Sequence, residues 1–265
     1  MLKIGFIGAG NMGGAIINGI LSKYGANAEI HAFDSVSEKI SALAEKGVIP
    51  ERSAADVVKT CKYVLLAIKP QTFDDVIPQL KNAVTEDNVI ISIAAGIGEE
   101  YLGSALIPQL KAVIVMPNTP FLLGEGATAL AKGKYVADEE FAEVVKIFET
   151  GGKCAEIPMD KMKEIIAVNG SSPAFIYLYA KAFIDYAKNE GIDADAAKLL
   201  FAQSLIGSAK MITDSGYTID ELIKMVSSPG GTTLAGLEEL YKGDLEKIAK
   251  AACKACTKRA YELSK

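Results

Sequence analysis

Short, apolar, β-rich runs alternate with helical patterns from the start of the chain to about Met159. The runs that we expect to form strands are residues 3–8, 28–33, 63–68, 88–94, 112–117, 127–133 and 153–158. Helical patterns fall between most of them, for example over residues 12–23 and 37–45. Strands that are apolar almost throughout and alternate with helices are typical of a parallel sheet covered on both faces. The pattern therefore predicts an α/β domain over residues 1–159.

Beyond Asp160 the strand-like runs stop and longer amphipathic patterns take their place. Helices are expected over residues 174–189, 194–213, 219–225, 234–241 and 245–263. Glycine with Asn or Asp at 189–191 and 214–216 supplies the stop signals that are typical of helix ends. The pattern predicts a second, all-α domain over residues 160–265.

The first helix of this second domain is apolar on more than one face, with Phe175, Ile176, Leu178 and Phe183 among its side chains. A helix that is hydrophobic nearly all round must be buried on several sides. Because a domain of this size cannot hide so much apolar surface alone, we expect the chain to form a homo-oligomer.

Composition limits the possible partners and location. A formal net charge of -5 over 265 residues argues against a nucleic-acid partner, which would require a basic face. No run approaches the roughly 18 apolar residues of a membrane span, and the first residues enter a glycine-broken strand instead of a secretion signal. We therefore expect a cytoplasmic protein with no membrane and no nucleic-acid partner.

The cysteines fit the same location. Cys61, Cys154, Cys253 and Cys256 are too few for a fold built on disulfides. The last two form a C-x-x-C pair, but they lie in a Lys/Ala-rich helical segment with no second pair and no histidine nearby. We interpret them as helical neighbours on one face and expect no metal site.

A glycine-rich motif follows the first expected strand. Its glycines, Gly8, Gly10 and Gly13, form G-x-G-x-x-G at the start of a helix, within a strand–helix–strand unit. The first glycine permits a tight turn, the second lets backbone approach a pyrophosphate, and the third lets helix and strand pack closely. The N–H groups at the helix start would bind the phosphates. Cofactor contacts are expected from Ile7, Gly8, Gly10, Asn11, Met12 and Gly13.

Asp34 ends the second expected strand and bears on which nicotinamide cofactor binds. A carboxylate here binds the adenosine ribose hydroxyls of NAD and repels the 2′-phosphate of NADP. However, Ser35, Ser37 and Lys39 follow, and hydroxyls with a cation could accept that phosphate. Asp34 could also be a simple strand-end or capping residue. We expect Asp34 and Ser35 to contact the cofactor and leave NAD against NADP open.

Three further strands end in segments suited to a ligand. Ligands of open parallel sheets bind at the carboxyl ends of the strands. Small residues there let backbone lie against a flat cofactor. The cofactor residues expected at these ends are Ala67, Ile68, Lys69, Pro70, Ala94, Ala95, Gly96 and Asn118.

The sequence offers no obvious catalytic acid or base. The one histidine, His31, lies inside the second expected strand, where packing is its expected role. A hydroxyacid dehydrogenase is disfavoured, because Lys163 and Asn169 do not form the Lys-x-x-x-Asn pair of such enzymes. The glycine motif is undamaged, so nothing in it supports the alternative of a nucleotide sensor without catalysis. A protonated C=N bond, in contrast, accepts hydride readily and requires mainly orientation.

Residues 227–233 read Ser-Ser-Pro-Gly-Gly-Thr-Thr and interrupt the helical pattern. Thr232 is the expected N-cap of the next helix. Free N–H groups at Gly231, Thr232 and Thr233 could converge on a substrate carboxylate. An ordinary capped turn between helices is the alternative interpretation.

Taken together, these residues resemble the pyrroline-5-carboxylate reductase family over nearly the whole chain. The segments that carry the resemblance are residues 6–12, 67–71, 116–120, 170–175 and 227–233. The last segment resembles the signature of the family. Residues 170–175 differ from the Gly-Ser-Gly-Pro-Ala-Tyr of the family at the second Gly and at the Tyr.

The resemblance implies reduction of 1-pyrroline-5-carboxylate to L-proline by NADH or NADPH. It also implies a Rossmann domain followed by a helical domain that interlocks with a second subunit, as a dimer or a larger ring of dimers. The implied substrate residues are Ser172, Ser228, Gly230, Gly231, Thr232 and Thr233. Thr233 is expected to lie near the ring nitrogen as the catalytic residue.

Overall fold

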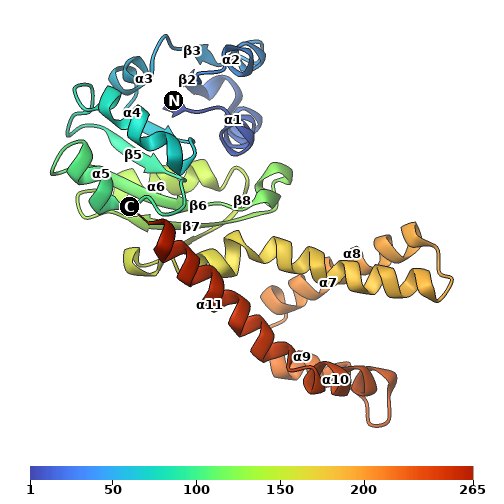
Figure 1. Ribbon diagram of the computed structural model, residues 1–265. Coiled ribbons are helices and arrows are strands. Elements are labelled where there is room, and N and C mark those ends of the chain that lie inside the picture. Colours follow the sequence, from blue (N-terminus) through green and yellow to red (C-terminus); the bar gives the residue numbers. More distant parts are fainter. Residues whose placement is uncertain (265) are drawn as a thin grey trace. The chain divides into compact units, whose positions relative to one another are not determined.

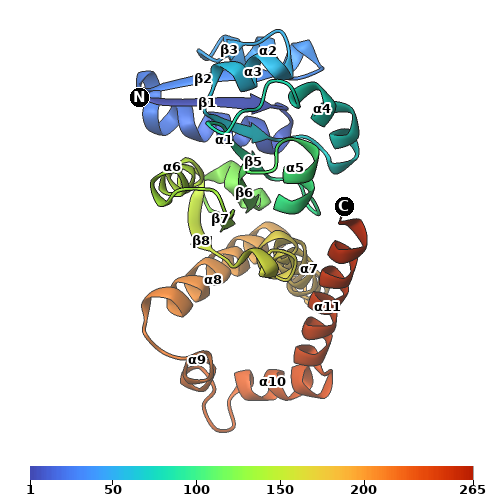
Figure 2. The same ribbon diagram turned by 90° about the vertical axis from the view of Figure 1, so that its left-hand side faces the viewer.

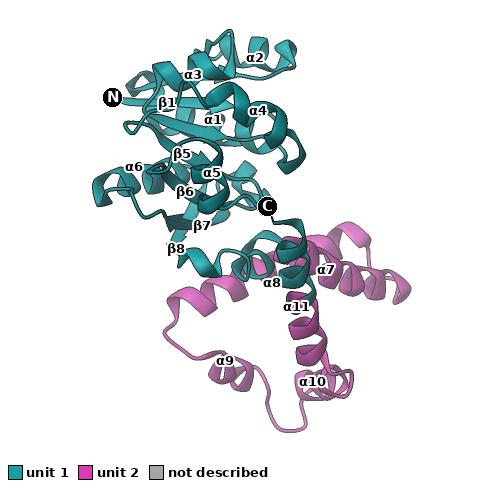
Figure 3. Ribbon diagram, turned by 60° about the vertical axis from the view of Figure 1, so that its left-hand side comes forward, with its two compact units in different colours: residues 1–171, 255–265 teal, residues 172–254 magenta. Residues whose placement is uncertain are grey.

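The computed structural model describes residues 1–264 and divides the chain into two compact units (Figure 3). The first unit comprises residues 1–171 with the chain from Ala255 onward, and the second comprises Ser172–Lys254. This division differs from the one expected at residue 159. The reason is that Asn169 bonds to the main chain of the sheet strands, while the end of the last helix packs against Gly96.

An eight-stranded sheet forms the centre of the first unit, in the order β3-β2-β1-β4-β5-β6-β7-β8 (Figure 1). The strands are β1 Leu2–Ile7, β2 Ala28–Phe33, β3 Ile49–Pro50, β4 Tyr63–Leu66, β5 Val89–Ser92, β6 Lys111–Met116, β7 Gly126–Lys132 and β8 Gly152–Glu156. Every run predicted as a strand is confirmed. The two-residue strand β3 was not predicted, because two residues carry no readable period.

One pair of strands departs from the predicted parallel arrangement. β6 and β7 pair antiparallel, with Met116 opposite Ala129, whereas β7 and β8 are parallel to each other. The segment between β6 and β7, residues 117–125, is shorter than the dozen or so residues that a parallel crossover needs. The chain therefore turns back along the edge of an otherwise parallel sheet.

Helices cover both faces of the sheet and enclose two apolar cores. One core packs beneath α1 Asn11–Tyr24, α2 Ser37–Ala44 and α6 Asp138–Phe148. The other packs beneath α3 Ala54–Thr60, α4 Phe73–Leu80 and α5 Glu99–Ala105. Short turns join these elements: η1 Gly25–Asn27, η2 Pro70–Thr72, η3 Thr119–Leu123, η4 Met159–Lys161 and the π-turn η5 Ile166–Gly170. The layered arrangement confirms the doubly covered α/β class.

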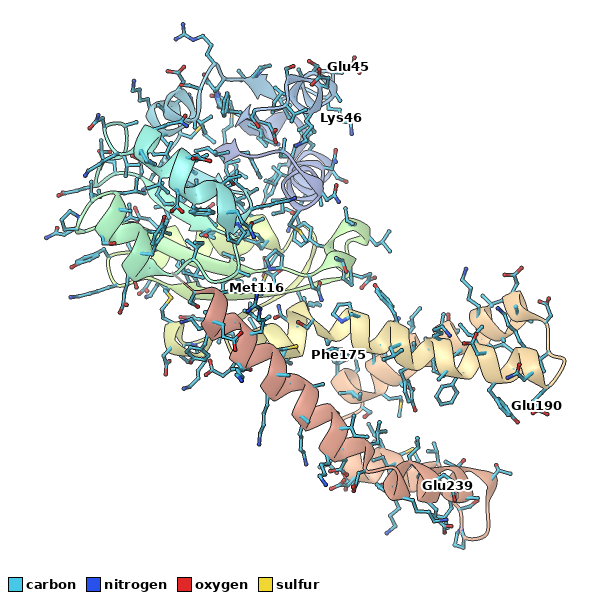
Figure 4. All side chains as sticks on the ribbon, in the orientation of Figure 1. Glu45, Lys46, Met116, Phe175, Glu190 and Glu239 are labelled. Carbon is cyan, nitrogen blue, oxygen red and sulfur yellow. The ribbon has the colours of Figure 1, made fainter. Side chains whose placement is uncertain are left out.

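The remaining helices follow the predicted pattern closely. They are α7 Ser172–Asn189, α8 Ala194–Asp214, α9 Ile219–Met225, α10 Thr232–Lys242 and α11 Leu245–Leu263. Helices α7 and α8 lie side by side as a hairpin, and Glu190 marks the turn between them (Figure 4). An open loop joins α9 to α10 (Figure 2).

Aromatic rings join the two helices of the hairpin, and much apolar surface remains uncovered. The ring of Phe183 lies 4.6 Å from that of Phe201 and 4.8 Å from that of Tyr179, between centroids. Leu178 and Leu199 are each 70% exposed in the single chain. Among the described residues, none of the helices has the length and apolar character that crossing a membrane would require.

Candidate functional site

The loop after β1 is shaped by two glycines that touch other main chain. Gly8 has φ +99°, and a Cβ there would lie 2.5 Å from the carbonyl oxygen of Ala67. A Cβ on Gly13 would lie 2.6 Å from the carbonyl oxygen of Gly8. Only glycine fits these positions, because the loops after β1 and β4 are in contact. The turn and packing roles predicted for the two glycines match this geometry.

Gly10 differs from its neighbours. It has φ -71°, caps the start of α1, and a Cβ built on it would meet no atom within 4 Å among the described residues. Open space above a glycine at the start of a 14-residue helix is what close approach of a pyrophosphate requires. The cradle therefore fits a dinucleotide.

The other residues expected to contact a cofactor in this loop differ in which of their atoms are accessible. Ile7 is fully buried, so a contact from Ile7 would come from its main chain. Its carbonyl accepts the N–H of Ala67 at 2.8 Å, which holds the two strand ends together. Asn11 is exposed and Met12 is half-buried in the first turn of α1. Their roles toward a cofactor stay predictions.

The side chain of Asp34 lies at the end of β2 and is tied to the glycine loop. Its Oδ2 accepts the N–H of Ala9 at 2.7 Å, and its Oδ1 accepts the N–H of Val36 at 2.9 Å. Lys39 Nζ lies 3.2 Å from Oδ1. Burial of the group raises the pKa of Asp34, but these hydrogen bonds outweigh burial and lower its pKa below the ordinary value. Ser35, next in the chain, is exposed.

The segment after β4 runs along the same edge of the sheet. Ala67 and Ile68 are half-buried, Lys69 is exposed, and Pro70 begins η2. The carbonyl of Lys69 accepts the N–H of Thr72 at 2.9 Å, which fixes the turn. These residues border the glycine loop, as expected from the order of the strands.

The segment after β5 packs against the end of the last helix. Ala94 is buried and Ala95 is exposed. Gly96 has φ +82°, and a Cβ there would lie 2.8 Å from the carbonyl oxygen of Leu263. Ala94 and Gly96 also line a cavity of about 460 Å³ together with Tyr261 near the end of α11. Packing against the last helix explains why glycine stands at position 96 without a ligand. The contact between Gly96 and a cofactor stays a prediction.

The side chain of Asn118 forms hydrogen bonds within the first unit. Its side chain is buried, its Nδ2 donates to the carbonyl of Asn169 at 3.1 Å, and its Oδ1 accepts the N–H of Ala127 at 2.9 Å. Asn169 in turn donates from Nδ2 to the carbonyls of Met116 at 2.7 Å and Ala127 at 3.1 Å. The amide keeps a second N–H and a second lone pair, and its contact with a cofactor stays a prediction. The linking role of Asn169 was missed, because its partners are main-chain carbonyls distant in sequence.

The turn at residues 227–233 lies in the second unit, and two of its predicted details are wrong. Gly231, rather than Thr232, is the N-cap of α10. The N–H of Gly231 is not free, because it donates to the carbonyl of Ser228 at 2.9 Å. Gly230 has φ +72°, which favours glycine in the turn itself, whereas a Cβ on Gly231 would lie 2.6 Å from Ser228 Oγ, a side-chain atom that can rotate away.

What remains for a ligand is the first turn of α10. Thr232 and Thr233 are its first two residues, and both are exposed. No carboxylate occupies the first turn of this helix, which leaves the positive end of its dipole unopposed locally. Ser172 is the first residue of α7 and is half-buried. The expected substrate residues thus all belong to the second unit, and the cofactor residues to the first.

His31, which the sequence analysis set aside as a catalytic residue, is packed, as predicted. His31 is buried, with Nδ1 2.7 Å from Glu51 and Nε2 2.8 Å from Glu29. Lys163 lies over the ring of Tyr261, 4.4 Å from its centroid, whereas Asn169 binds main-chain carbonyls. Lys163 and Asn169 therefore have separate partners, which agrees with the absence of a dehydrogenase-type pair.

Two family models match the chain. Residues 159–263 match the model described as pyrroline-5-carboxylate reductase dimerisation, and residues 3–96 match NADP oxidoreductase coenzyme F420-dependent. A pyrroline-5-carboxylate reductase of Methanosarcina acetivorans is 35% identical, over 99% of this chain and 98% of the relative. The Escherichia coli protein of that name is 32% identical over the same shares.

Solved structures of similar proteins agree over the whole chain. A pyrroline-5-carboxylate reductase from Coxiella burnetii is 29% identical with a TM-score of 0.91, covering 99% of this chain and 98% of the other. The Plasmodium falciparum pyrroline carboxylate reductase with NADP bound is 27% identical with a TM-score of 0.86, covering 100% and 98%.

Proposed function

We propose that this chain, which belongs to the pyrroline-5-carboxylate reductase family, reduces 1-pyrroline-5-carboxylate to L-proline with NADH or NADPH, the last step of proline biosynthesis. The observation that carries the proposal is the presence in one chain of an open glycine cradle at Gly10 and the Ser227–Thr233 turn. Full-length relatives of that name support it.

The first unit supplies the cofactor site in this proposal. A bound nicotinamide supplies the hydride, which adds to the carbon of the C=N bond. The N–H groups at the start of α1 would hold the pyrophosphate beside Gly10, and the segments after β4 and β5, at the same edge of the sheet, would contact the nicotinamide. The protonated ring nitrogen already draws electrons from the carbon, so the protein needs no strong acid.

The second unit supplies the substrate site. The N–H groups of Thr232 and Thr233 at the start of α10 bind the carboxylate, with Ser228 and Gly230 shaping the turn. Ser172 forms part of the wall of the site. The hydroxyl of Thr233 orients the ring nitrogen or holds its proton, so that the hydride reaches one carbon.

The test follows oxidation of NADH and of NADPH with pyrroline-5-carboxylate, with a 3-oxoacid and with buffer alone. We expect turnover with the imine only. Absence of turnover with the imine would reject the proposed reaction. Thr233→Ala should lower kcat/KM for the imine by at least about tenfold and leave cofactor affinity unchanged, because the lost contact is to the substrate. Thr213→Ala, an exposed threonine in α8, is the matched control and should change neither value. An unchanged kcat/KM in Thr233→Ala would remove this residue from the site.

The same proposal includes a cytoplasmic homo-oligomer. Exposed apolar residues on α7 and α8, with Leu178 and Leu199 each 70% exposed, support burial against a second copy. The match of residues 159–263 to a dimerisation model supports the same assembly. Sedimentation of the purified protein would test it, and a monomer at micromolar concentration would contradict it.

A further inference from the structure

We infer that Asp34 makes this protein prefer NADH to NADPH, because its fixed carboxylate at the end of β2 repels a 2′-phosphate. The inference rests on cofactor binding at the glycine loop and extends the proposed function to the choice of cofactor. That choice stays open on sequence alone, since Ser35, Ser37 and Lys39 follow the carboxylate.

The carboxylate is held in place from two sides. Ala9, between the first two loop glycines, donates to Oδ2 at 2.7 Å, and Val36, just before α2, donates to Oδ1 at 2.9 Å. Asp34 thus joins the loop that approaches the pyrophosphate to the loop that follows β2, where the adenosine ribose of a dinucleotide lies in this fold. With 8% of its side chain exposed, Asp34 cannot turn away without losing both hydrogen bonds.

The charge of this carboxylate is present at neutral pH. Burial raises the pKa of Asp34, but the two main-chain hydrogen bonds and Lys39 together lower it below the ordinary value of 3.8. A negative charge is therefore present at the end of β2 at neutral pH when a cofactor approaches. A carboxylate can accept about four hydrogen bonds, and here two come from the main chain and two from Lys39 Nζ, at 3.2 and 3.3 Å. The exposed, flexible side chain of Lys39 is the donor that ribose hydroxyls would replace.

The segment that follows β2 carries too few cations to offset its carboxylates for a phosphate. Residues 34–39 contain two acidic side chains, Asp34 and Glu38, and one basic side chain, Lys39, for a net charge of -1. Lys39 Nζ already lies 3.2 Å from the carboxylate of Asp34. The hydroxyl of Ser37 donates to Glu38 at 3.4 Å, which places a second carboxylate beside it.

Arg52 is the arginine that could offset this charge, because it follows β3, the strand that pairs with β2. The arginines of the chain are Arg52 and Arg259, and both lie outside the loop after β2. Arg52 pairs with Asp56 of α3 at 3.6 Å, and Arg259 pairs with Glu262 at 2.9 Å. A ribose with free hydroxyls fits this loop, whereas a phosphate of charge near -2 meets a net negative segment.

Isothermal titration of the purified full-length protein with NADH and with NADPH, without imine, tests the inference. We expect NADPH to bind at least about tenfold more weakly, which corresponds to about 1.4 kcal/mol. Asp34→Asn removes the charge and keeps one acceptor oxygen, so it should lower the ratio of the two Kd values several-fold. Glu45→Gln removes an exposed charge at the C-terminal end of α2, outside residues 34–39, and should leave the ratio unchanged.

Two results would overturn the inference. One is a wild-type protein that binds NADPH as tightly as NADH, a measurement that requires no variant to fold. The other is a folded Asp34→Asn protein, checked by its thermal melting without cofactor, whose ratio equals that of the wild type. Failure of imine reduction with either cofactor would reject the proposed function and leave these binding ratios intact, so the two failures are distinguishable.

Discussion

Glu140 gives the sharpest test of the forces that hold the sheet unit together. It lies in the first turn of α6, with 9% of its side chain exposed. Its Oε1 lies 2.8 Å from both Lys62 Nζ and Lys111 Nζ, and its Oε2 accepts the N–H of Ala137 at 3.2 Å. One carboxylate thus links α6 to the segment before β4 and to the first residue of β6. Glu140→Gln keeps the shape and removes the charge.

The expected loss follows from the pKa of Glu140. Burial raises this pKa, but the hydrogen bonds from Lys111, Lys62 and Ala137 outweigh burial and lower it from 4.5 to about 2. The drop corresponds to about 3 kcal/mol of free energy of unfolding. Because the folded pKa is depressed, this stabilisation is present above pH 4.5 and is lost as the pH falls toward 2. Glu140→Gln should therefore cost about 3 kcal/mol at pH 7 and roughly half as much at pH 3.

Urea unfolding at fixed protein concentration, followed by circular dichroism at pH 7 and pH 3, measures this difference. Glu143→Gln is the control, because it removes an equal charge from the same helix in an exposed pair with Lys146. We expect no measurable change from it. An equal loss in Glu140→Gln at both pH values would refute the electrostatic reasoning, and so would a loss no larger than in the control.

Two further predictions concern the sites. Gly10→Ala should leave thermal stability unchanged and weaken cofactor binding, measured by titration, at least about tenfold. Gly13→Ala should lower the melting temperature, because the added Cβ would meet the carbonyl of Gly8. Equal melting temperatures for the two variants would contradict this. Asn169→Leu should lower the free energy of unfolding by about 2 kcal/mol in urea, since two buried carbonyls lose their donor. The exposed Asn18→Ala serves as its control and should change little.

The sequence predicted the strands and helices well because their apolar periods are local. It did not reveal the direction of β7, because an apolar run looks alike in either direction. The length of residues 117–125 was the available signal, and it excludes a parallel crossover. The boundary between the units shifted for a different reason. Residues 160–171 are held by Asn169, whose partners Met116 and Ala127 are distant in sequence.

In the candidate site, too, the features that depend on neighbouring residues were predictable, and the contacts between residues distant in sequence were not. The carboxylate at Asp34 was predictable from its position after a strand, but the N–H of Ala9 as its partner was not. The helix start at Thr232 was predicted one residue away from the true N-cap, Gly231. A turn in which the carbonyl of Ser228 accepts the N–H of Gly231 moves the cap, and its sequence does not distinguish the two positions.

The glycines of the cofactor site separate into two kinds when a Cβ is built on each. At Gly8, Gly13 and Gly96 the added carbon would lie within 3 Å of a carbonyl oxygen, so the fold alone demands glycine there. Gly10 has an ordinary negative φ and no described atom within 4 Å of its added carbon. Gly10 is also the N-cap of α1, a position where glycine is favoured, and the open space above it is what close approach of a pyrophosphate requires. Within the motif, Gly10 is therefore the glycine whose surroundings leave room for a dinucleotide.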